Sequence, residues 1–537
     1  MMRFVLPILL CVGCQQYDPK KDVENNVQNP DVTGFGIGEF DAVLLFNEVQ
    51  TDNESTYQRD DLSFPDWIEL YNASTEPVDL SLVTIVSNAG TWEGQAGTLA
   101  PGDFQLLLAD DITADGHLPF GLDNNGEELT MYVDGIASDR LYTGDLDADV
   151  ILERFPDGGE WFPSIRATPG DPNRQPSETL DPTDSIYQLD DIIEIRFYLT
   201  PQALIDIDGW DKQEVPAQME FDKSVYYENI GLRLKGSGTY QGINAKPSFR
   251  VDINQGEAGR YLRGLKNLNL HNSGWDASYM REYMAYKLFR DAGSPASRVA
   301  YARVYVNDVD FGLYLNVETP DNKMMKQWYE NNDGEIYEGQ TWNDDPGQGG
   351  FNVANIEMDD GPMQPDPFHL WEIDRIVGGP SSDAAVAQLA EHLDFNRFLA
   401  FVAGECITDQ WDGYESPHNW RMYIDHDRGK VDFLPSGIDV ATYANDNTID
   451  DSNGNVFEFC WDNQGCRQAY KQKLIQMADM MDTLDYSGHF QDVFSFIQAD
   501  ILSDPRMSHS QGQVQSEMQS VGSNVASRPN QIRSQAN

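Results

Sequence analysis

The sequence predicts a multidomain protein in which an all-β sandwich precedes a larger α+β domain. Residues 35–175 carry short alternating apolar runs separated by turn clusters. Residues 176–185 are polar and contain two prolines, as expected of a linker. Residues 186–537 begin with strand patterns, alternate strands with helices and finish helical. The chain has 537 residues, 40% of them hydrophobic and 11% aromatic, which is enough to fill several packed cores.

The chain is strongly acidic, with a formal net charge of −53 from 89 acidic and 36 basic side chains. Phosphate backbones require a positive protein surface, so this charge excludes nucleic acid as the main partner. Acidic surfaces keep exported proteins soluble. The alternative interpretation is that the acidic groups bind cations or attract a basic substrate.

The N-terminus has the pattern of an export signal. One arginine, Arg3, precedes the apolar run Phe4–Val12, which is too short to span a bilayer. Gly13 and Cys14 then resemble the lipobox of bacterial lipoproteins. That resemblance implies a signal peptide over residues 1–13, cleavage before Cys14 and lipidation of its thiol. The alternative is an ordinary signal peptide with an incidental cysteine.

Residues 14–34 are polar and rich in Asp, Asn and Gln, and we interpret them as a tether. No other stretch is long and apolar enough to cross a bilayer, so the lipid would be the sole membrane attachment. Gln15, rather than Asp, follows Cys14, which is compatible with sorting to the outer membrane or the cell surface.

The first domain is predicted from four alternating runs, namely Ala42–Phe46, Trp67–Tyr71, Phe104–Leu108 and Leu129–Val133. Turn clusters such as Asn88–Gly90 and Asp123–Gly126 separate them. Short strands with regular turn signals favour a β-sandwich.

Several motifs in this segment then resemble the lamin-tail domain, an immunoglobulin-like sandwich. They are Asn47–Val49, Asp66–Asn72, Val78–Leu80, Pro101–Gly102, Arg154–Gly159 and Pro169–Asn173. The resemblance implies an accessory or binding module, and no catalytic constellation is visible in this segment.

A glycine-rich loop is the first candidate functional element of the second domain. Alternating apolar residues flank the loop 235–242, so two paired strands should enclose it. Gly236 and Gly238 would let backbone N–H groups approach a phosphate, although most such loops are plain hairpins. Lys246 follows, where a lysine could contact phosphate oxygens.

A helix from Asp276 through Asp291 is expected next, because Asp276 or Ser278 can cap its start and Gly293 can end it. Glu282 lies in its first turns, within reach of a lysine on a neighbouring sheet. Two strands, 301–306 and 311–317, follow. A glycine loop between strands, a lysine and then a helix with a glutamate is the order of elements in a kinase N-lobe.

The segment from Asp409 to Asp439 contains the strongest indication of a catalytic site. Asp412 is followed by Asn419, and an intervening strand pair separates them from Asp439. Phosphoryl transfer needs one carboxylate that orients the attacking hydroxyl and further oxygen ligands for Mg²⁺. The alternative is that Asp412 and Asn419 only shape a loop.

The segment from Gly231 to Asp439 resembles the CotH family of spore-coat kinases. The matching elements are Arg233–Gly236 with Lys246, Leu268–Leu270, Asp276 with Arg281–Glu282, Val306–Asn307, Gly312–Tyr314, Glu318, Trp411–Tyr414 and His418–Asn419. The resemblance implies a protein-kinase-like fold that uses ATP with Mg²⁺ or Mn²⁺ to phosphorylate Ser/Thr of exported proteins. It implies Asp412 as the catalytic base, Asp439 and Asn419 as metal ligands, and Lys246 paired with Glu282 beside the nucleotide.

One motif departs from the family. Members commonly have Pro-Trp-Asp-x-Asp at the metal site, whereas this chain has Pro435-Ser436-Gly437-Ile438-Asp439. A lost carboxylate removes charge from a magnesium shell. An alternative function is therefore a catalytically impaired scaffold or adhesion protein that acts in envelope assembly.

Among the five cysteines, Cys460 and Cys466 are near each other in the sequence, and export would favour a disulfide between them. Cys406 would then remain unpaired and be buried.

Overall fold

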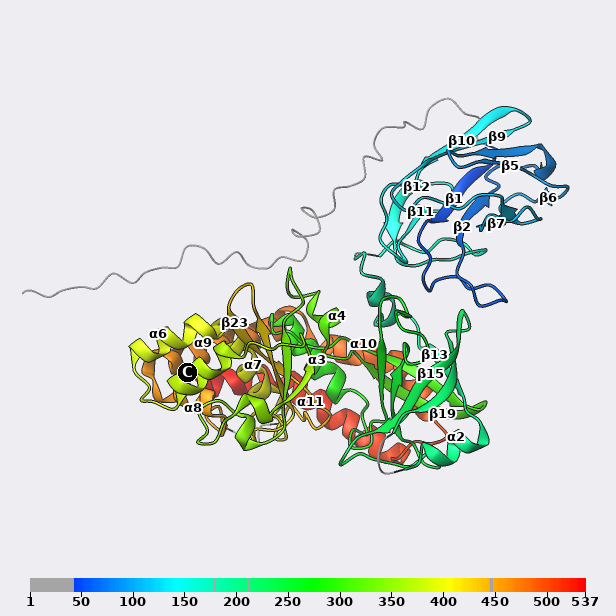
Figure 1. Cartoon of the computed structure of the whole chain (residues 1–537). Coiled ribbons are helices and arrows are strands. Elements are labelled where there is room, and N and C mark those ends of the chain that lie inside the picture. The colour runs from blue at the N-terminus through cyan, green and yellow to red at the C-terminus, as the bar shows by residue number, and fades with distance from the viewer. Residues whose placement is uncertain (1–42, 178, 210–212, 445–447) are drawn as a thin grey trace, which may run out of the picture. The chain divides into compact units, whose positions relative to one another are not determined.

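The computed structural model describes residues 43–177, 179–209, 213–444 and 448–537. The expected signal peptide, the tether and the lipidation site Cys14 lie outside these residues. The described residues divide into two compact units, one made of residues 43–53 and 65–181, the other of residues 54–64 and 182–537 (Figure 1). A β-rich first unit and a mixed α/β second unit confirm the multidomain class.

The first unit contains two main sheets and a short strand pair. The larger sheet has the order β12 (Glu160–Ser164), β11 (Ile151–Phe155), β1 (Leu45–Gln50), β2 (Asp66–Tyr71), β7 (Phe104–Ala109), β8 (His117–Leu118). The smaller sheet has the order β10 (Ile136–Tyr142), β9 (Glu128–Val133), β4 (Val83–Val86), β5 (Thr91–Glu93), and β3 (Val78–Asp79) pairs with β6 (Thr98–Leu99). Side chains of both sheets, such as Phe46 and Met131, share one core. The lamin-tail assignment stays a prediction.

Three glutamates form a row across the larger sheet, on the face turned away from that core. Glu48 lies opposite Glu69 on one side and Glu153 on the other. All three are fully buried. The backbone N–H groups of Thr168 and Gly170 donate to Glu48 (2.9 Å) and Glu69 (2.6 Å). Four of the motifs that suggested a lamin tail meet in one polar network, because Asn47 donates to Glu69 and Asp157, and the N–H of Asn173 donates to Asp157.

The second unit begins with a closed seven-stranded barrel. Its order is β13 (Ile193–Tyr198), β14 (Val215–Phe221), β15 (Val225–Lys235), β16 (Ser248–Asp252), β17 (Asn267–His271), β19 (Val309–Val317), β18 (Val299–Val306). Only the β13–β18 pair is parallel. Alternate residues such as Leu234, Phe249 and Leu270 fill the interior. The intervening polar residues therefore face outward.

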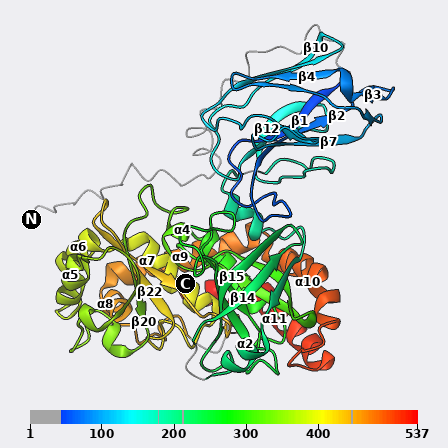
Figure 2. The same ribbon diagram turned by 45° about the vertical axis from the view of Figure 1, so that its right-hand side comes forward.

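The rest of this unit consists of helices and a second antiparallel sheet, as the left part of its ribbon shows in Figure 2. The sheet has the order β21 (Glu357–Asp360), β20 (Glu335–Gly339), β22 (Trp420–Asp425), β23 (Lys430–Pro435). The helices are α2 (Pro201–Asp206), α3 (Arg281–Asp291), α4 (Asn322–Met325), α5 (Phe368–Val377), α6 (Asp383–His392), α7 (Phe395–Thr408), α8 (Asn455–Asp462), α9 (Gln464–Thr483), α10 (Tyr486–Leu502) and α11 (Gln511–Ala536).

The polar C-terminal stretch forms a long helix, α11, which runs from beside the barrel to α7 and α9 (Figure 1). Its fully buried Arg528 donates to the carbonyl of Ile407 at the end of α7 (2.9 Å). Arg528 thereby satisfies a carbonyl that the helix leaves without a partner.

The disulfide between Cys460 and Cys466 is present, with a Cα–Cα distance of 5.1 Å. It joins α8 to α9 rather than closing a loop, because both cysteines lie in helices. Cys406 is free and half-buried, and burial raises the pKa of its thiol to about 11. Across the described ranges, no helix has the length and apolarity needed to cross a membrane.

Candidate active site

Asp412 lies in the loop that follows α7, and the geometry of that loop explains the Asp-Gly-Tyr motif. The Asn419 side-chain amide donates to the carboxylate (2.9 Å) and to the carbonyl (2.7 Å) of Asp412. Glu405, buried on α7, accepts the N–H of Tyr414 (2.9 Å). A Cβ at Gly413 would lie 2.0 Å from this carboxylate, so only glycine fits. Glu405 thus holds the loop that presents Asp412.

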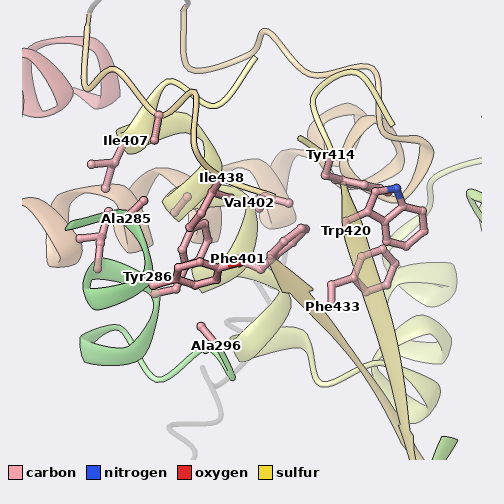
Figure 3. Close-up of a cluster of buried hydrophobic side chains, with 14 of the residues drawn as sticks. Ala285, Tyr286, Ala296, Phe401, Val402, Ile407, Tyr414, Trp420, Phe433 and Ile438 are labelled. Carbon is pink, nitrogen blue, oxygen red and sulfur yellow. The ribbon is translucent and has the colours of Figure 1, made fainter. Parts of the chain in front are cut away.

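Asp439 lies in a second loop, which follows β23. The side chain of Gln410 donates to the carbonyl of Gly437 (3.1 Å), and the N–H of Ser436 donates to that of Asn419 (3.2 Å). Ile438 anchors this loop in the core, beside Phe401 and close to the stack of Trp420 on Phe433 (Figure 3). The two loops are therefore fixed side by side.

The pKa of the Asp439 carboxyl is raised to about 7, chiefly by burial and then by the negative charges of Glu282, Asp276 and Asp412. These four carboxylates come from three distant parts of the sequence. Asp412 and Glu282 thus lie near enough to Asp439 for their charges to act on it, and Asn419 bonds to Asp412, while the roles of these residues stay predictions. Carboxylates crowded in this way favour a bound cation.

A positive group faces them from the outer face of the barrel. Lys235, at the end of β15, donates to the imidazole of His271 (2.7 Å) and to the Asn269 side-chain oxygen (3.3 Å). His271 in turn contacts both carboxylate oxygens of Glu282 on α3 (2.9 Å each). Arg421 on β22 is close enough to affect the pKa of Lys235. The arrangement can hold a phosphate between cations and metal-binding oxygens.

Lys246 is not in this group, and its expected pairing with Glu282 is wrong. Its side chain is 1% exposed, and its ammonium donates to Asp504 (2.5 Å), to the Leu313 carbonyl (2.7 Å) and to the Tyr279 hydroxyl (2.9 Å). Asp504 follows α10, so the sequence alone could not reveal this partner. Gly312 is required nearby, because its Cβ would collide with the Asp504 carboxylate.

The glycine loop lies between β15 and β16 as expected, and Lys246 lies in it rather than on β16. Gly236 has φ +104°, which favours glycine. A Cβ at Gly238 would lie 2.8 Å from Trp275, whose exposed indole covers the loop. The Asn272 side chain donates to the carbonyls of Thr239 (3.2 Å) and Lys246 (2.7 Å). The loop is thus held by its neighbours.

The residues present fit a magnesium or manganese ion that is shared with a nucleotide. In the part of the chain that the structure describes, no three His, Cys, Asp or Glu side chains form a complete metal cage. Mg²⁺ is usually held by one or two carboxylates together with substrate phosphates, so a full protein cage is not required. The crowded carboxyl of Asp439 and the amide oxygen of Asn419 are suitable ligands.

Sequence reasoning missed Lys235, His271 and Arg421. The alternation of side chains along a strand could have revealed Lys235 and His271. Leu234 and Leu270 face the interior of the barrel, so the residues that follow them must face outward. The cross-strand register confirms this, because Arg233, Arg250 and Asn269 are aligned across three strands. No local signal places Arg421, which contacts Asp359 (2.8 Å) and Glu338 (3.0 Å) from other strands.

Comparison with known proteins shows the family to which the second unit is related. A family model described as "CotH kinase protein" matches residues 232–521, more than half of the chain. This protein belongs to the CotH kinase family. The matched stretch contains every barrel strand from β16 onward, both loops of the candidate site and most of the C-terminal helices.

Three curated relatives share this region at low identity. The inner spore coat protein H of Bacillus subtilis is 22% identical over 265 residues, which is 47% of this chain and 69% of that protein. Spore coat protein homolog 1 of Rhizopus delemar is 22% identical over 199 residues, and Invasin CotH7 of the same fungus is 23% identical over 197. Both alignments cover 35% of this chain and about a third of the relative.

Proposed function

We propose that this protein is an exported, lipid-anchored kinase that transfers the γ-phosphate of ATP to Ser or Thr hydroxyls of envelope or surface proteins. The convergence of Asp412, Asn419 and Asp439 opposite Lys235, within a chain of the CotH kinase family, carries this proposal. Anchoring through Cys14 is part of the proposal and rests on the sequence. The names of the three relatives support a surface or exported location.

In the reaction, the acceptor hydroxyl oxygen attacks the γ-phosphorus while the bond from that phosphorus to the β–γ bridging oxygen breaks, and ADP leaves. The carboxylate of Asp412 accepts the hydroxyl proton. The amide of Asn419 holds this carboxylate in place (2.9 Å). Lys235 and Arg421 supply positive charge beside the phosphates.

Asp439 and the Asn419 oxygen would hold a divalent ion, which would neutralise charge on the phosphates. Asp439 must be ionised to do so, and its raised pKa means that a bound cation would displace a proton from it. Gln410 and Ile438 position the loop that carries it.

A second candidate is a kinase-like scaffold without catalysis. Gly437 favours it, because the family commonly has an Asp there. The Cβ of any other residue at 437 would lie 3.1 Å from the side chain of Asn419. The space that a second carboxylate would need is thus partly filled by Asn419.

Phosphate transfer decides between the two candidates. Soluble protein that begins after the tether would be incubated with labelled ATP and Mn²⁺ or Mg²⁺, with itself and a Ser-rich protein as acceptors. The variant is Asp412→Ala, and the matched control is Asp427→Ala in the exposed β22–β23 turn. Transfer that is lost only in the Asp412 variant supports the kinase. Nucleotide binding without transfer supports the scaffold.

A further inference from the structure

A histidine stands between the lysine and the glutamate of the candidate site. The Lys235 Nζ lies 2.7 Å from His271 Nε2, and His271 Nδ1 lies 2.9 Å from each oxygen of Glu282. The three side chains come from β15, β17 and α3. The lysine and glutamate are therefore coupled through an imidazole and not by direct contact.

The protonation of the imidazole follows from its two partners. A carboxylate accepts only, so Nδ1 must carry the proton that bonds to Glu282. A lysine ammonium donates only, so Nε2 must offer its lone pair to Lys235. Both bonds exist together only while His271 is neutral and in this tautomer.

We propose that His271 is a positioning residue that holds Lys235 toward the phosphates of a nucleotide, and that acid disengages Lys235 by protonating the imidazole. This inference rests on the proposed function. A protonated His271 has no acceptor for Lys235, and its charge repels the ammonium.

The remaining bonds of Lys235 fit this role. Its ammonium has three N–H groups, of which one bonds to His271 and one to Asn269 (3.3 Å). The Asn269 amide donates to the Thr319 hydroxyl (2.7 Å), which keeps the Asn269 oxygen turned toward the lysine. The third N–H is left for a phosphate oxygen.

The surrounding charges set the direction of the switch. Lys235 is influenced by Glu282, Arg421, Arg250 and Arg233, and burial lowers its pKa to about 7. His271 faces Glu282 and Lys235, and burial is the main reason why its pKa is lowered from 6.5. A lowered histidine pKa keeps the imidazole neutral at neutral pH. The coupling therefore holds near neutral pH and is lost only at a pH below the ordinary range of histidine protonation.

Binding of a non-hydrolysable ATP analogue with Mn²⁺ tests the role of His271 in the full chain. We expect His271→Ala to weaken binding about tenfold at pH ~7, which is the loss of one charge-assisted contact. His271→Gln should stay within about threefold, because its amide can accept from Lys235 and donate to Glu282.

The pH dependence separates positioning from a general structural role. Between about pH 7 and pH 5, wild-type binding should fall about tenfold more than binding by His271→Gln, which lacks the titrating imidazole and keeps the pH dependence of Asp439 and of the phosphates. Equal acid losses, or unchanged binding in the Ala variant, would overturn the inference.

Amine labelling of Lys235, followed by mass spectrometry, is independent of nucleotide binding. We expect the labelling rate at neutral pH to rise at least about threefold in His271→Ala and to stay unchanged in His271→Gln, since the amide retains the hydrogen bond. Lys223, whose side chain is 70% exposed, is the internal control. Absent nucleotide binding in all variants would refute the proposed function, whereas unchanged labelling would refute the hold of His271 on Lys235.

Discussion

The two units each contain a group of crowded carboxylates, and the groups differ in how their oxygens are satisfied. In the first unit Glu69, Glu48 and Glu153 are aligned across three strands. In the second, Asp439 lies near Asp412 and Glu282. Burial is the main reason why the pKa values of Glu69, Glu153 and Asp439 are each raised to about 7.

The protein itself shields the glutamate row from solvent. Backbone N–H groups of Thr168 and Gly170 donate to Glu48 and Glu69, both oxygens of Glu153 lack a hydrogen-bond partner, and all three side chains are inaccessible to solvent. Around Asp439, by contrast, Glu282 contacts the imidazole of His271, and its charge acts on Lys235 together with that of Arg421. A raised pKa alone therefore does not identify an active site. The partners of the carboxylate decide whether it serves structure or chemistry.

The largest expected difference between the groups is in catalysis. Asp412→Ala should lower phosphate transfer by about 10²–10⁴-fold, the usual contribution of a general base. The unfolding midpoint should change little, because Asp412 is half-exposed. Transfer rates and urea unfolding of the same samples provide the measurement. A large loss of stability would place Asp412 with the structural group.

Glu48→Ala should have the opposite profile. It removes the acceptor of the Thr168 N–H and hydroxyl, at a cost of about 1–3 kcal/mol for each buried donor left without a partner. Faster hydrogen exchange in β1, with phosphate transfer unchanged, is the expected result. Glu48→Gln is the matched control, since it keeps one acceptor oxygen. Slow exchange in the Ala variant would contradict a structural role for the row.

Asp439 should make nucleotide binding depend on pH. Because its carboxyl must lose a proton to hold a metal, Mn²⁺-dependent affinity for the nucleotide should fall about tenfold per pH unit below about 7. Asp439→Asn should weaken binding and make the remaining pH dependence less steep. The measurement is a titration with the ATP analogue at several pH values. A variant that kept the same slope would exclude Asp439 as the titrating group.

The glutamate row should respond to pH in the opposite direction. The folded pKa values of Glu69 and Glu153 lie above the ordinary 4.5, so the folded unit binds protons more tightly than the unfolded chain. Their contribution to stability is complete below about pH 4.5 and is lost as the pH rises through about 7. Exchange in β1 and β11 should therefore accelerate between these values. Acceleration toward acid pH would contradict the prediction.

The smallest expected effect concerns Gly437. Gly437→Ala should cost about 1 kcal/mol from its positive φ and should weaken nucleotide binding a few-fold by displacing Asn419. Gly429→Ala is a matched control, because Gly429 has φ +61° against +56° for Gly437 and lies in a distant turn. Equal binding by the two variants would show that Asn419 tolerates the added methyl group.

The sequence predicted the elements better than their long-range partners. Alternating runs located β2, β9 and β16, and the acidic motif contained Asp412 and Asn419, whose side chains are hydrogen-bonded to each other. Lys246 was assigned to the wrong partner because Asp504 is 258 residues away and no local pattern connects them. The lysine at 235 was visible as an outward residue of β15, but only the register of β17 shows that His271 meets it.

The ion pair of Lys246 with Asp504 also affects the order in which parts of the chain can fold. A lysine buried without a counter-charge is strongly disfavoured, so we expect the packing around Lys246 to stay incomplete until Asp504 has been synthesised. If the chain is synthesised and exported from its N-terminus, the glycine loop would reach its final structure only after nearly the whole chain has been made. We therefore expect nascent chains that end before α10 to remain sensitive to proteases in the barrel, whereas the first unit could already resist them.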